Sequence, residues 1–239
     1  MEIIDANTVF GVWPRKELDI SINNLLKIMH ENKVEKALSL SMKGVFYDYE
    51  EGNAETLKAC REHPEIIPVA TCDLRKYWGD KRFIKAIVEN GFKALRLFPD
   101  LQNWPINYEP FEILCENLIP YRLPIIISVT GMGSITAISR ICGPGEIPVI
   151  LTGAGYGLFA EAIAVMKKYP GIYLETACMD TPDGFEIFVR EVGATRLIFG
   201  SYSPINYFRP SFACLEKADL KDEEKSLIAS GNIKKLLRI

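Results

Sequence analysis

The sequence predicts an α/β protein, a single (β/α)8 TIM barrel that takes up residues 1–239 as one domain. Short β-rich apolar segments alternate with amphipathic segments of helical length from one end of the chain to the other. Eight such pairs in 239 residues give about 30 residues per pair, the size of a βα unit. No linker or low-complexity segment interrupts them, whereas an open doubly wound sheet would show fewer strands and one dominant glycine loop.

Each predicted strand is a short and predominantly apolar run. Several of these runs, such as Pro124–Ser128, are apolar throughout, which is typical of parallel strands that are covered on both faces. The eight strands are expected at Ile3–Ala6, Val34–Leu40, Ile66–Ala70, Ala94–Phe98, Pro124–Ser128, Pro148–Leu151, Gly171–Glu175 and Arg196–Gly200.

The segments between the strands have the 3.6-residue period of helices that cover a sheet with one face. In the first of them Leu25, Leu26 and Met29 share a face, and Gly91 follows the third as a helix-terminating glycine. The helices are expected at Ile20–His30, Ala54–His63, Lys81–Asn90, Tyr108–Leu118, Ser134–Ile141, Phe159–Lys168, Gly184–Glu191 and Pro210–Ile239.

The composition argues against nucleic-acid and membrane partners. Lys and Arg number 28 against 31 Asp and Glu, so no basic surplus is present to neutralise phosphates. No apolar run reaches the roughly 18 residues of a membrane span, and the start MEIIDANTVFG does not resemble a secretory signal. The 6 cysteines are scattered without a CxxC pair, which is typical of reduced thiols. We therefore expect a cytoplasmic protein.

The candidate site residues are the polar residues at the predicted carboxyl ends of the strands, where TIM barrels carry their active sites. Three of them have charges that suit catalysis, namely Asp73, Glu175 and Arg96. Seven more are expected to line a pocket for a small-molecule ligand: Asn7, Ser41, Lys43, Ser128, Thr130, Thr152 and Tyr202.

Two interpretations of the charged candidates remain open. Asp73 and Glu175 are suited to act as general acid and base, or to bind a cationic ligand. Alternatively, they form ion pairs with Arg96 or Lys43 at a solvated rim. Arg96 itself suits either a clamp on a carboxylate or phosphate or an interior ion pair. Asp5 is expected to be structural and to accept hydrogen bonds from neighbouring loops.

Other features of the predicted barrel mouth are less specific. The glycine-rich junctions TGMGS (130–134) and TGAGYG (152–157) precede helices, where backbone amides can bind an anion. Aromatic residues are frequent in the loops and suit a flat ligand, the covering of the barrel top or the face of a homodimer. Cys72 and Cys178 also fall at strand ends, but neither has a histidine nearby to make it a nucleophile.

Several motifs, in chain order, resemble the amidohydrolase-related family. The start IIDANTVFG is similar to the family's opening strand, which reads I-D-x-H-x-H before an aromatic residue and glycine. The segments GFKALRLFP, LPIIISVTG and PVILTGAGYG resemble its fourth, fifth and sixth strands. The tail RLIFGSYSPINYFRPSFACLEKADLKDEEKSLIASGNIKKLL resembles its closing strand, which ends F-G-S-D-x-P, and the acidic helix after it. The resemblance implies a TIM barrel of the decarboxylase- and lactonase-like branch of metal-dependent hydrolases.

Alignment with these motifs indicates that the family's metal ligands are replaced in this chain. Asn7 and Val9 stand where the opening strand has its two histidines. Ser128 and Gly153 stand at the histidines of the fifth and sixth strands, and Tyr202 stands at the closing aspartate. Valine and glycine have no ligating side chain, and Asn, Ser and Tyr are poor ligands for zinc. We therefore expect no metal and no cofactor.

The two histidines of the chain, His30 and His63, fall at predicted helix ends on the opposite face of the barrel, as surface or capping residues. Loss of the metal would matter, because bound zinc lowers the pKa of water from about 15.7 to about 7. A carboxylate base alone accelerates a reaction by only ~10²–10⁴-fold. The resemblance thus implies a divergent hydrolase with a metal-free site that acts on a small amide, lactone or carboxylate compound. The alternative is a non-catalytic barrel that binds a small molecule or has a regulatory role.

Overall fold

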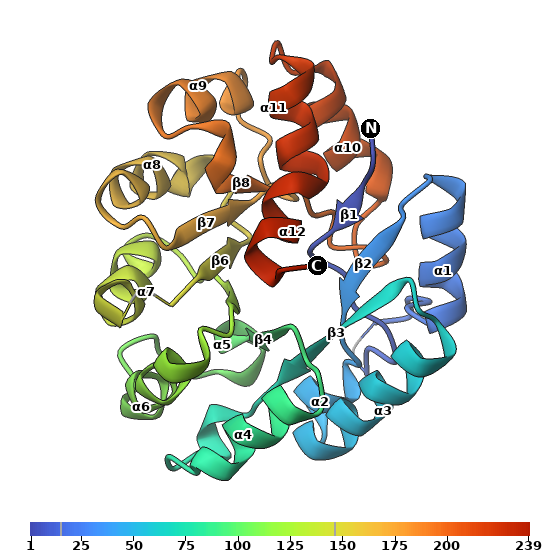
Figure 1. Ribbon diagram of the computed structural model, residues 1–239, viewed down its shortest axis with the longest axis vertical. Helices are drawn as coiled ribbons and strands as arrows, with labels where there is room; N and C mark the ends of the chain where they lie inside the picture. Colours follow the sequence, from blue (N-terminus) through green and yellow to red (C-terminus); the bar gives the residue numbers. More distant parts are fainter. Residues whose placement is uncertain (15, 146) are drawn as a thin grey trace.

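The computed structural model describes residues 1–14, 16–145 and 147–239, and in it eight parallel strands form one sheet in chain order (Figure 1). Every predicted strand overlaps one of them, so the predicted TIM barrel is confirmed. The strands are β1 (Ile4–Asp5), β2 (Lys36–Ser39), β3 (Ile66–Thr71), β4 (Ala94–Leu97), β5 (Ile125–Ser128), β6 (Val149–Thr152), β7 (Ile172–Glu175) and β8 (Leu197–Ile198).

The sheet closes on itself because the segments that follow β1 and β8 pair with each other. The Ala6 amide donates to the Phe199 carbonyl at 3.0 Å. Farther along, Thr8 and Ser203 form a parallel bridge, and the Val9 amide donates to the Ser203 carbonyl at 3.2 Å. Closure brings the carboxyl ends of all the strands to one rim, the barrel mouth, where their polar residues meet.

The helices surround the sheet, and none of them in the described part of the chain is long and apolar enough to cross a membrane (Figure 1). Short helices directly after β2 and β4 were not predicted. The helices are α1 (Ile22–Glu31), α2 (Lys43–Phe46), α3 (Tyr49–Glu62), α4 (Lys81–Glu89), α5 (Pro99–Gln102), α6 (Glu109–Leu118), α7 (Ser134–Cys142), α8 (Phe159–Lys168), α9 (Gly184–Glu191), α10 (Phe208–Lys217), α11 (Asp222–Ser226) and α12 (Asn232–Leu237).

Two predicted helix boundaries are corrected by the structure. The helix expected at Ala54–His63 begins five residues earlier, because Asp48 Oδ1 accepts hydrogen bonds from two first-turn amides at 3.0 Å. The helix expected over Pro210–Ile239 is divided into α10, α11 and α12. Its middle forms a π-turn at Leu227–Gly231, where the Ile228 carbonyl accepts a hydrogen bond from the Phe199 amide at 2.9 Å. The π-turn thus offers a carbonyl to the residue that follows β8.

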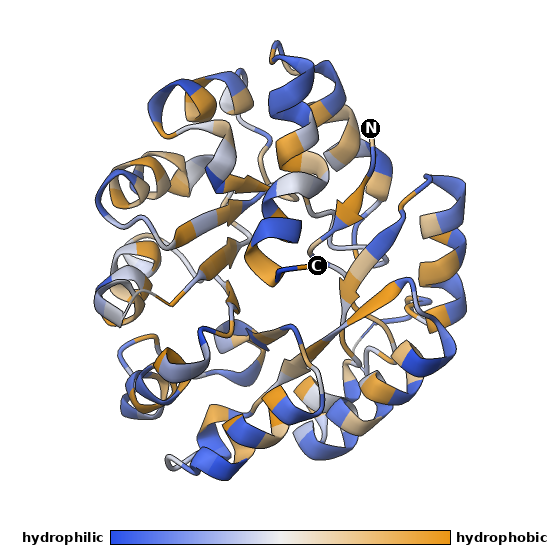
Figure 2. Ribbon diagram, in the orientation of Figure 1, coloured by the Kyte–Doolittle hydropathy of each residue, from blue (hydrophilic) through white to orange (hydrophobic). Residues whose placement is uncertain are grey.

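The apolar side chains form an inner core and an outer core on either side of the sheet. Figure 2 shows the strands mostly orange, with hydrophilic residues concentrated along the outer faces of the helices. The inner core fills the barrel, and α12 adds Ile233 and Leu237 to it, so this helix closes the end opposite the mouth (Figure 1). The strands contribute these buried side chains to the inner core: Ile4, Leu38, Ile67, Val69, Ala94, Ile126, Ile150 and Ile198.

Candidate functional site

At the barrel mouth a side-chain hydrogen bond joins Asn7, which follows β1, to Glu175 at the end of β7. Asn7 Nδ2 donates to Glu175 Oε2 at 2.8 Å, and both residues are buried. The intervening strand leads into Gly200, which leaves room for this contact. A Cβ added there would lie 2.7 Å from both Asn7 Cβ and Glu175 Cδ, closer than packed atoms allow. The glycine thus makes the contact possible.

Glu175 and Asp5 are almost fully buried at this end of the barrel, and burial raises the pKa of each. Glu175 accepts hydrogen bonds from Asn7 and from the Ala177 amide, but the loss of hydration outweighs them and raises its pKa to about 8. Asp5 accepts hydrogen bonds from the Asn7 and Ser201 amides, both at 3.0 Å, and its pKa is raised to about 6. At neutral pH Glu175 is therefore mostly protonated, and Asp5 is mostly ionised. The bonds of Asp5 fit its expected structural role.

Arg96 lies on the inner side of β4 and is 2% exposed. Its Nη1 donates to the Thr8 carbonyl at 3.3 Å, and its Cζ lies 4.7 Å from the ring centroid of Phe98 and 5.4 Å from that of Tyr202. Burial lowers the pKa of Arg96, while Tyr202 and the neighbouring acidic groups oppose this effect. Its Nε has no hydrogen-bond partner among the described residues, which leaves a buried donor toward the site.

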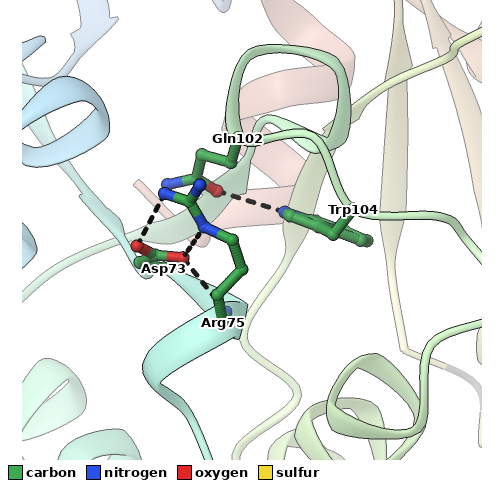
Figure 3. Close-up of polar contacts among 4 residues, drawn as sticks. All are labelled: Asp73, Arg75, Gln102 and Trp104. Atoms are coloured by element: carbon green, nitrogen blue, oxygen red, sulfur yellow. Dashed lines mark hydrogen bonds and ion pairs between the residues drawn. The ribbon is translucent and has the colours of Figure 1, made fainter.

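Asp73 is bonded to a different arginine. Arg75 donates from Nε to Asp73 Oδ1 at 2.9 Å and from Nη2 to Oδ2 at 3.0 Å (Figure 3). Burial raises the pKa of Asp73, but the bonds and charge of Arg75 outweigh burial, so the net pKa lies below its usual value. Figure 3 also shows the neighbouring bond from Trp104 Nε1 to Gln102 Oε1. No hydrogen bond or ion pair between described residues joins Asp73 to Glu175 or Arg96.

Ser41 and Lys43 lie after β2, on a separate part of the rim. Lys43 Nζ forms an ion pair with Glu51 of α3 at 2.6 Å, and the Lys43 amide donates to Ser41 Oγ at 3.2 Å. Both residues line a cavity of about 290 Å³ together with Tyr47 and Gly11. The alternative interpretation expected Lys43 to pair with Asp73 or Glu175, whereas its ion-pair partner in the structure is Glu51.

The remaining pocket candidates lie after β5, β6 and β8. Thr152 Oγ1 and Ser128 Oγ are 3.4 Å apart, whereas Thr130 is exposed and its amide donates to Ser134 Oγ at 3.3 Å. Tyr202 packs its ring against Arg96 and has a left-handed backbone with φ 59°, which is rare for a tyrosine. Of the seven, Asn7 and Tyr202 contact the charged candidates.

The first glycine-rich junction is occupied by a side chain of the protein itself. Glu161 of α8 accepts hydrogen bonds from the Gly133 amide at 2.9 Å and the Thr136 amide at 2.7 Å. This carboxylate lies where an external anion would bind, so the structure argues against an anion site at 130–134.

The cysteines and histidines remain apart from this chemistry. Burial raises the pKa of Cys178 to about 11 and that of Cys72 further, so neither thiol ionises readily. His30 lies in the last turn of α1, and His63 ends α3. Both histidines are at helix ends, as predicted.

The residues at the mouth do not fit the divalent metal that the sequence resemblance implies for relatives. Val9 is fully buried in the inner core, Gly153 has no side chain, and the Tyr202 ring packs on the guanidinium of Arg96. A buried guanidinium repels a second cation. In the part of the chain that is described, no group of three or more His, Cys, Asp or Glu is placed to hold a metal ion.

The structure adds three residues to the site that the sequence did not single out for it. Gly200 could have been noticed in the FGS segment after the last strand, where its lack of a side chain matters. Arg75 could have been noticed two residues after Asp73. The buried Gln102 has an unpartnered Nε2 among described atoms, and no sequence signal pointed to it because it lies on the unpredicted helix α5.

The sequence profile of the amidohydrolase family (Amidohydro_2) matches residues 50–239. No curated protein sequence matches this chain.

Solved structures with low sequence identity share the fold. A 2,6-dihydroxybenzoate decarboxylase from Rhizobium has a TM-score of 0.78 and 11% identity, covering 100% of this chain and 99% of that one. A 5-carboxyvanillate decarboxylase from Sphingomonas paucimobilis has a TM-score of 0.76 and 12% identity, with the same coverage. A dihydroxybenzoic acid decarboxylase from Polaromonas, solved with manganese and 2-nitroresorcinol, has a TM-score of 0.75 and 14% identity, covering 99% and 97%.

Proposed function

Because this chain belongs to the amidohydrolase family, we propose that it is a divergent hydrolase with a metal-free site. Its substrate is a small amide, lactone or carboxylate compound. The observation that carries the proposal is the buried group of Glu175, Asn7 and Arg96, in which a proton donor and a cation lie at one end of the barrel.

Arg96 is the group that binds the ligand's carboxylate. It is a fixed cation with an unpartnered Nε, and guanidinium groups bind carboxylates through paired hydrogen bonds. The rings of Phe98 and Tyr202 beside it suit a flat ligand. The named solved relatives are decarboxylases of aromatic acids, which supports a carboxylate as the recognised group.

Glu175 is the proton donor of the proposed reaction. With a pKa of about 8 it holds a proton at neutral pH, so it does not repel a ligand carboxylate. As water adds to the substrate's carbonyl carbon, Glu175 can protonate the leaving oxygen or nitrogen, and the proton that the added water releases restores the acid. Asn7 holds Glu175 in place as a positioning residue. Asp73, the third predicted catalytic residue, remains a proposed contributor whose carboxylate is shared with Arg75.

The alternative proposal is a non-catalytic barrel that binds a small molecule. The observation that favours it is burial, because Asn7 and Arg96 are each 2% exposed and Glu175 is fully buried. Hydrolysis needs water beside the catalytic group as well as substrate. Side chains this buried exclude water, so a ligand bound beside them would not be turned over.

A binding and turnover experiment tests both proposals. Calorimetry with 2,6-dihydroxybenzoate, benzoate and uncharged benzamide measures affinity, and chromatography measures consumption of 4-carbamoylbenzoate, an amide that carries a carboxylate, and of small lactones. We expect wild type to bind the two acids and Arg96→Met to lose at least about tenfold in affinity. Arg82→Ala, which removes an exposed arginine on α4, is the control and should bind as wild type does.

The outcomes separate the two proposals. Glu175→Gln should keep most of the affinity and lose turnover if the protein is a hydrolase. Binding that Arg96→Met abolishes, without turnover of any compound, would support the non-catalytic barrel. Absence of binding to every acid would overturn both. Circular dichroism shows whether Arg96→Met is folded. If it is not, the turnover of Glu175→Gln is compared with that of wild type instead.

The proposed partners and location follow from the composition and the loop aromatic residues of the sequence. We propose a small-molecule ligand, no nucleic-acid or membrane partner, a cytoplasmic location and a homodimer. Exposed aromatic residues such as Trp78, Tyr156 and Tyr207 favour the homodimer, because aromatic side chains are enriched at interfaces. Light scattering after gel filtration would give the mass in solution, and a mass near 27.0 kDa would contradict the dimer.

A further inference from the structure

A second cavity lies at the end of the barrel that is opposite the proposed site. It has a volume of about 340 Å³, which is in the range of small-ligand sites. It lies between the residues that precede β5, β6 and β8 and the helix α12, which crosses this end of the barrel (Figure 1). The cavity therefore shares no lining residue with the barrel mouth.

The cavity is lined by cations. Arg196 precedes β8, and Lys235 and Arg238 come from α12 and its end; Arg122 also lines it. Among the described lining residues there is no aspartate or glutamate, and no described carboxylate forms an ion pair with Arg196, Lys235 or Arg238. The neighbouring Lys234, by contrast, is paired with Glu2. In a chain with a net charge of -3, such a concentration of positive charge is unusual.

Arg196 is held in a fixed orientation in this cavity. Its Nε donates to the Ile172 carbonyl at 2.9 Å, and its Nη2 donates to the Tyr169 carbonyl at 2.7 Å. Its Cζ lies 5.3 Å from the ring centroid of Tyr173. Carbonyl partners position the guanidinium without neutralising its charge. Its Nη1, which has no hydrogen-bond partner among the described residues, is left for a ligand.

We propose that this cavity binds a phosphate group of a small ligand through Arg196, Lys235 and Arg238. Three positive charges around one cavity match a group that carries about two negative charges and several acceptor oxygens. A ligand with a single carboxylate would leave most of this charge unbalanced. The proposal is independent of the reaction at the mouth, because the two places share no residue.

Calorimetry with inorganic pyrophosphate at low ionic strength tests the proposal. We expect wild type to bind pyrophosphate, and the double variant Lys235→Gln, Arg238→Gln to bind it at least about tenfold more weakly. Glutamine keeps part of each side-chain stem and removes the charge. Both residues are exposed at the end of the chain's last helix, so the variant should fold.

The control is Lys58→Gln, Arg61→Gln on α3, which removes the same charge from another exposed helix. It should change the affinity by no more than about twofold. Arg96→Met should leave pyrophosphate binding unchanged, so failure here and failure at the mouth are distinguishable. Benzoate should not compete. No binding by wild type, or equal losses in the test and control variants, would overturn the phosphate site.

Discussion

Asn7 and Glu175 are hydrogen-bonded across a strand that separates them. Asn7 follows β1, Glu175 ends β7, and their side chains meet at 2.8 Å over Gly200, which follows β8. Barrel closure makes this contact possible, since β8 lies between β7 and β1 only when the sheet is closed. The contact therefore depends on glycine at position 200, where any side chain would occupy the space between Asn7 and Glu175.

Gly200→Ala should destabilise the protein by roughly 1–3 kcal/mol, because the new methyl group would overlap with Asn7 and Glu175. Urea unfolding monitored by circular dichroism measures the change. Gly157→Ala is a matched control, since no atom of the described residues other than its own chain neighbours lies within 4 Å of a Cβ at that position. Equal unfolding midpoints for the two variants would contradict the proposed steric role of Gly200.

The pH dependence of stability should reveal the buried carboxyl of Glu175. Its pKa rises from 4.5 to about 8 on folding, so the folded state holds a proton that the unfolded state releases. The resulting contribution to the free energy of unfolding is complete below pH 4.5 and is lost as the pH rises to about 8. Asp5, whose pKa is raised to about 6, acts in the same direction at lower pH.

Between pH 5 and 8 the wild type should therefore lose on the order of 2–4 kcal/mol of unfolding free energy relative to Glu175→Gln. Denaturant titrations at several pH values measure both slopes. The control is Glu191→Gln, which removes a carboxyl whose pKa is lowered by Lys167, and it should keep the wild-type slope. Parallel curves for wild type and Glu175→Gln would mean that Glu175 is ionised in the folded protein.

The Asp73–Arg75 pair should contribute modest stability at neutral pH. Arg75→Ala should cost about 0.5–1 kcal/mol, because the Arg75 side chain is half exposed and solvent screens the pair. The loss should disappear at low pH, where Asp73 becomes protonated. Arg82→Ala breaks a pair of the same spacing with Asp80 on a more exposed surface, so its effect should be smaller. A larger loss of stability for Arg82→Ala than for Arg75→Ala would contradict this prediction.

Removal of metal should leave the protein unchanged, because the donor set at the mouth does not fit a divalent cation. After dialysis against a chelator, the melting temperature should stay within about 1 °C of the untreated sample. Elemental analysis of the purified protein should find well under one equivalent of zinc or manganese. One bound equivalent whose removal lowers the melting temperature would refute the metal-free site.

The sequence determined the fold, because the pattern of apolar runs and amphipathic segments is a local property that eight parallel strands and their helices must satisfy. It also placed Glu175, Arg96 and Asn7 at strand ends. It did not foresee the π-turn at Leu227–Gly231 between α11 and α12, whose Ile228 carbonyl bonds to the Phe199 amide, because that bond joins residues that are distant in the sequence.

Only the tertiary structure decided which charges meet. Asp73 and Arg96 are both at strand ends, yet Asp73 is bonded to Arg75, two residues away, and Arg96 lies inside the barrel beside Tyr202. The pKa of Glu175 likewise depends on burial by residues distant in sequence. Pairing and hydration are set by distances across a closed barrel, and these distances cannot be derived from the order of residues along one strand.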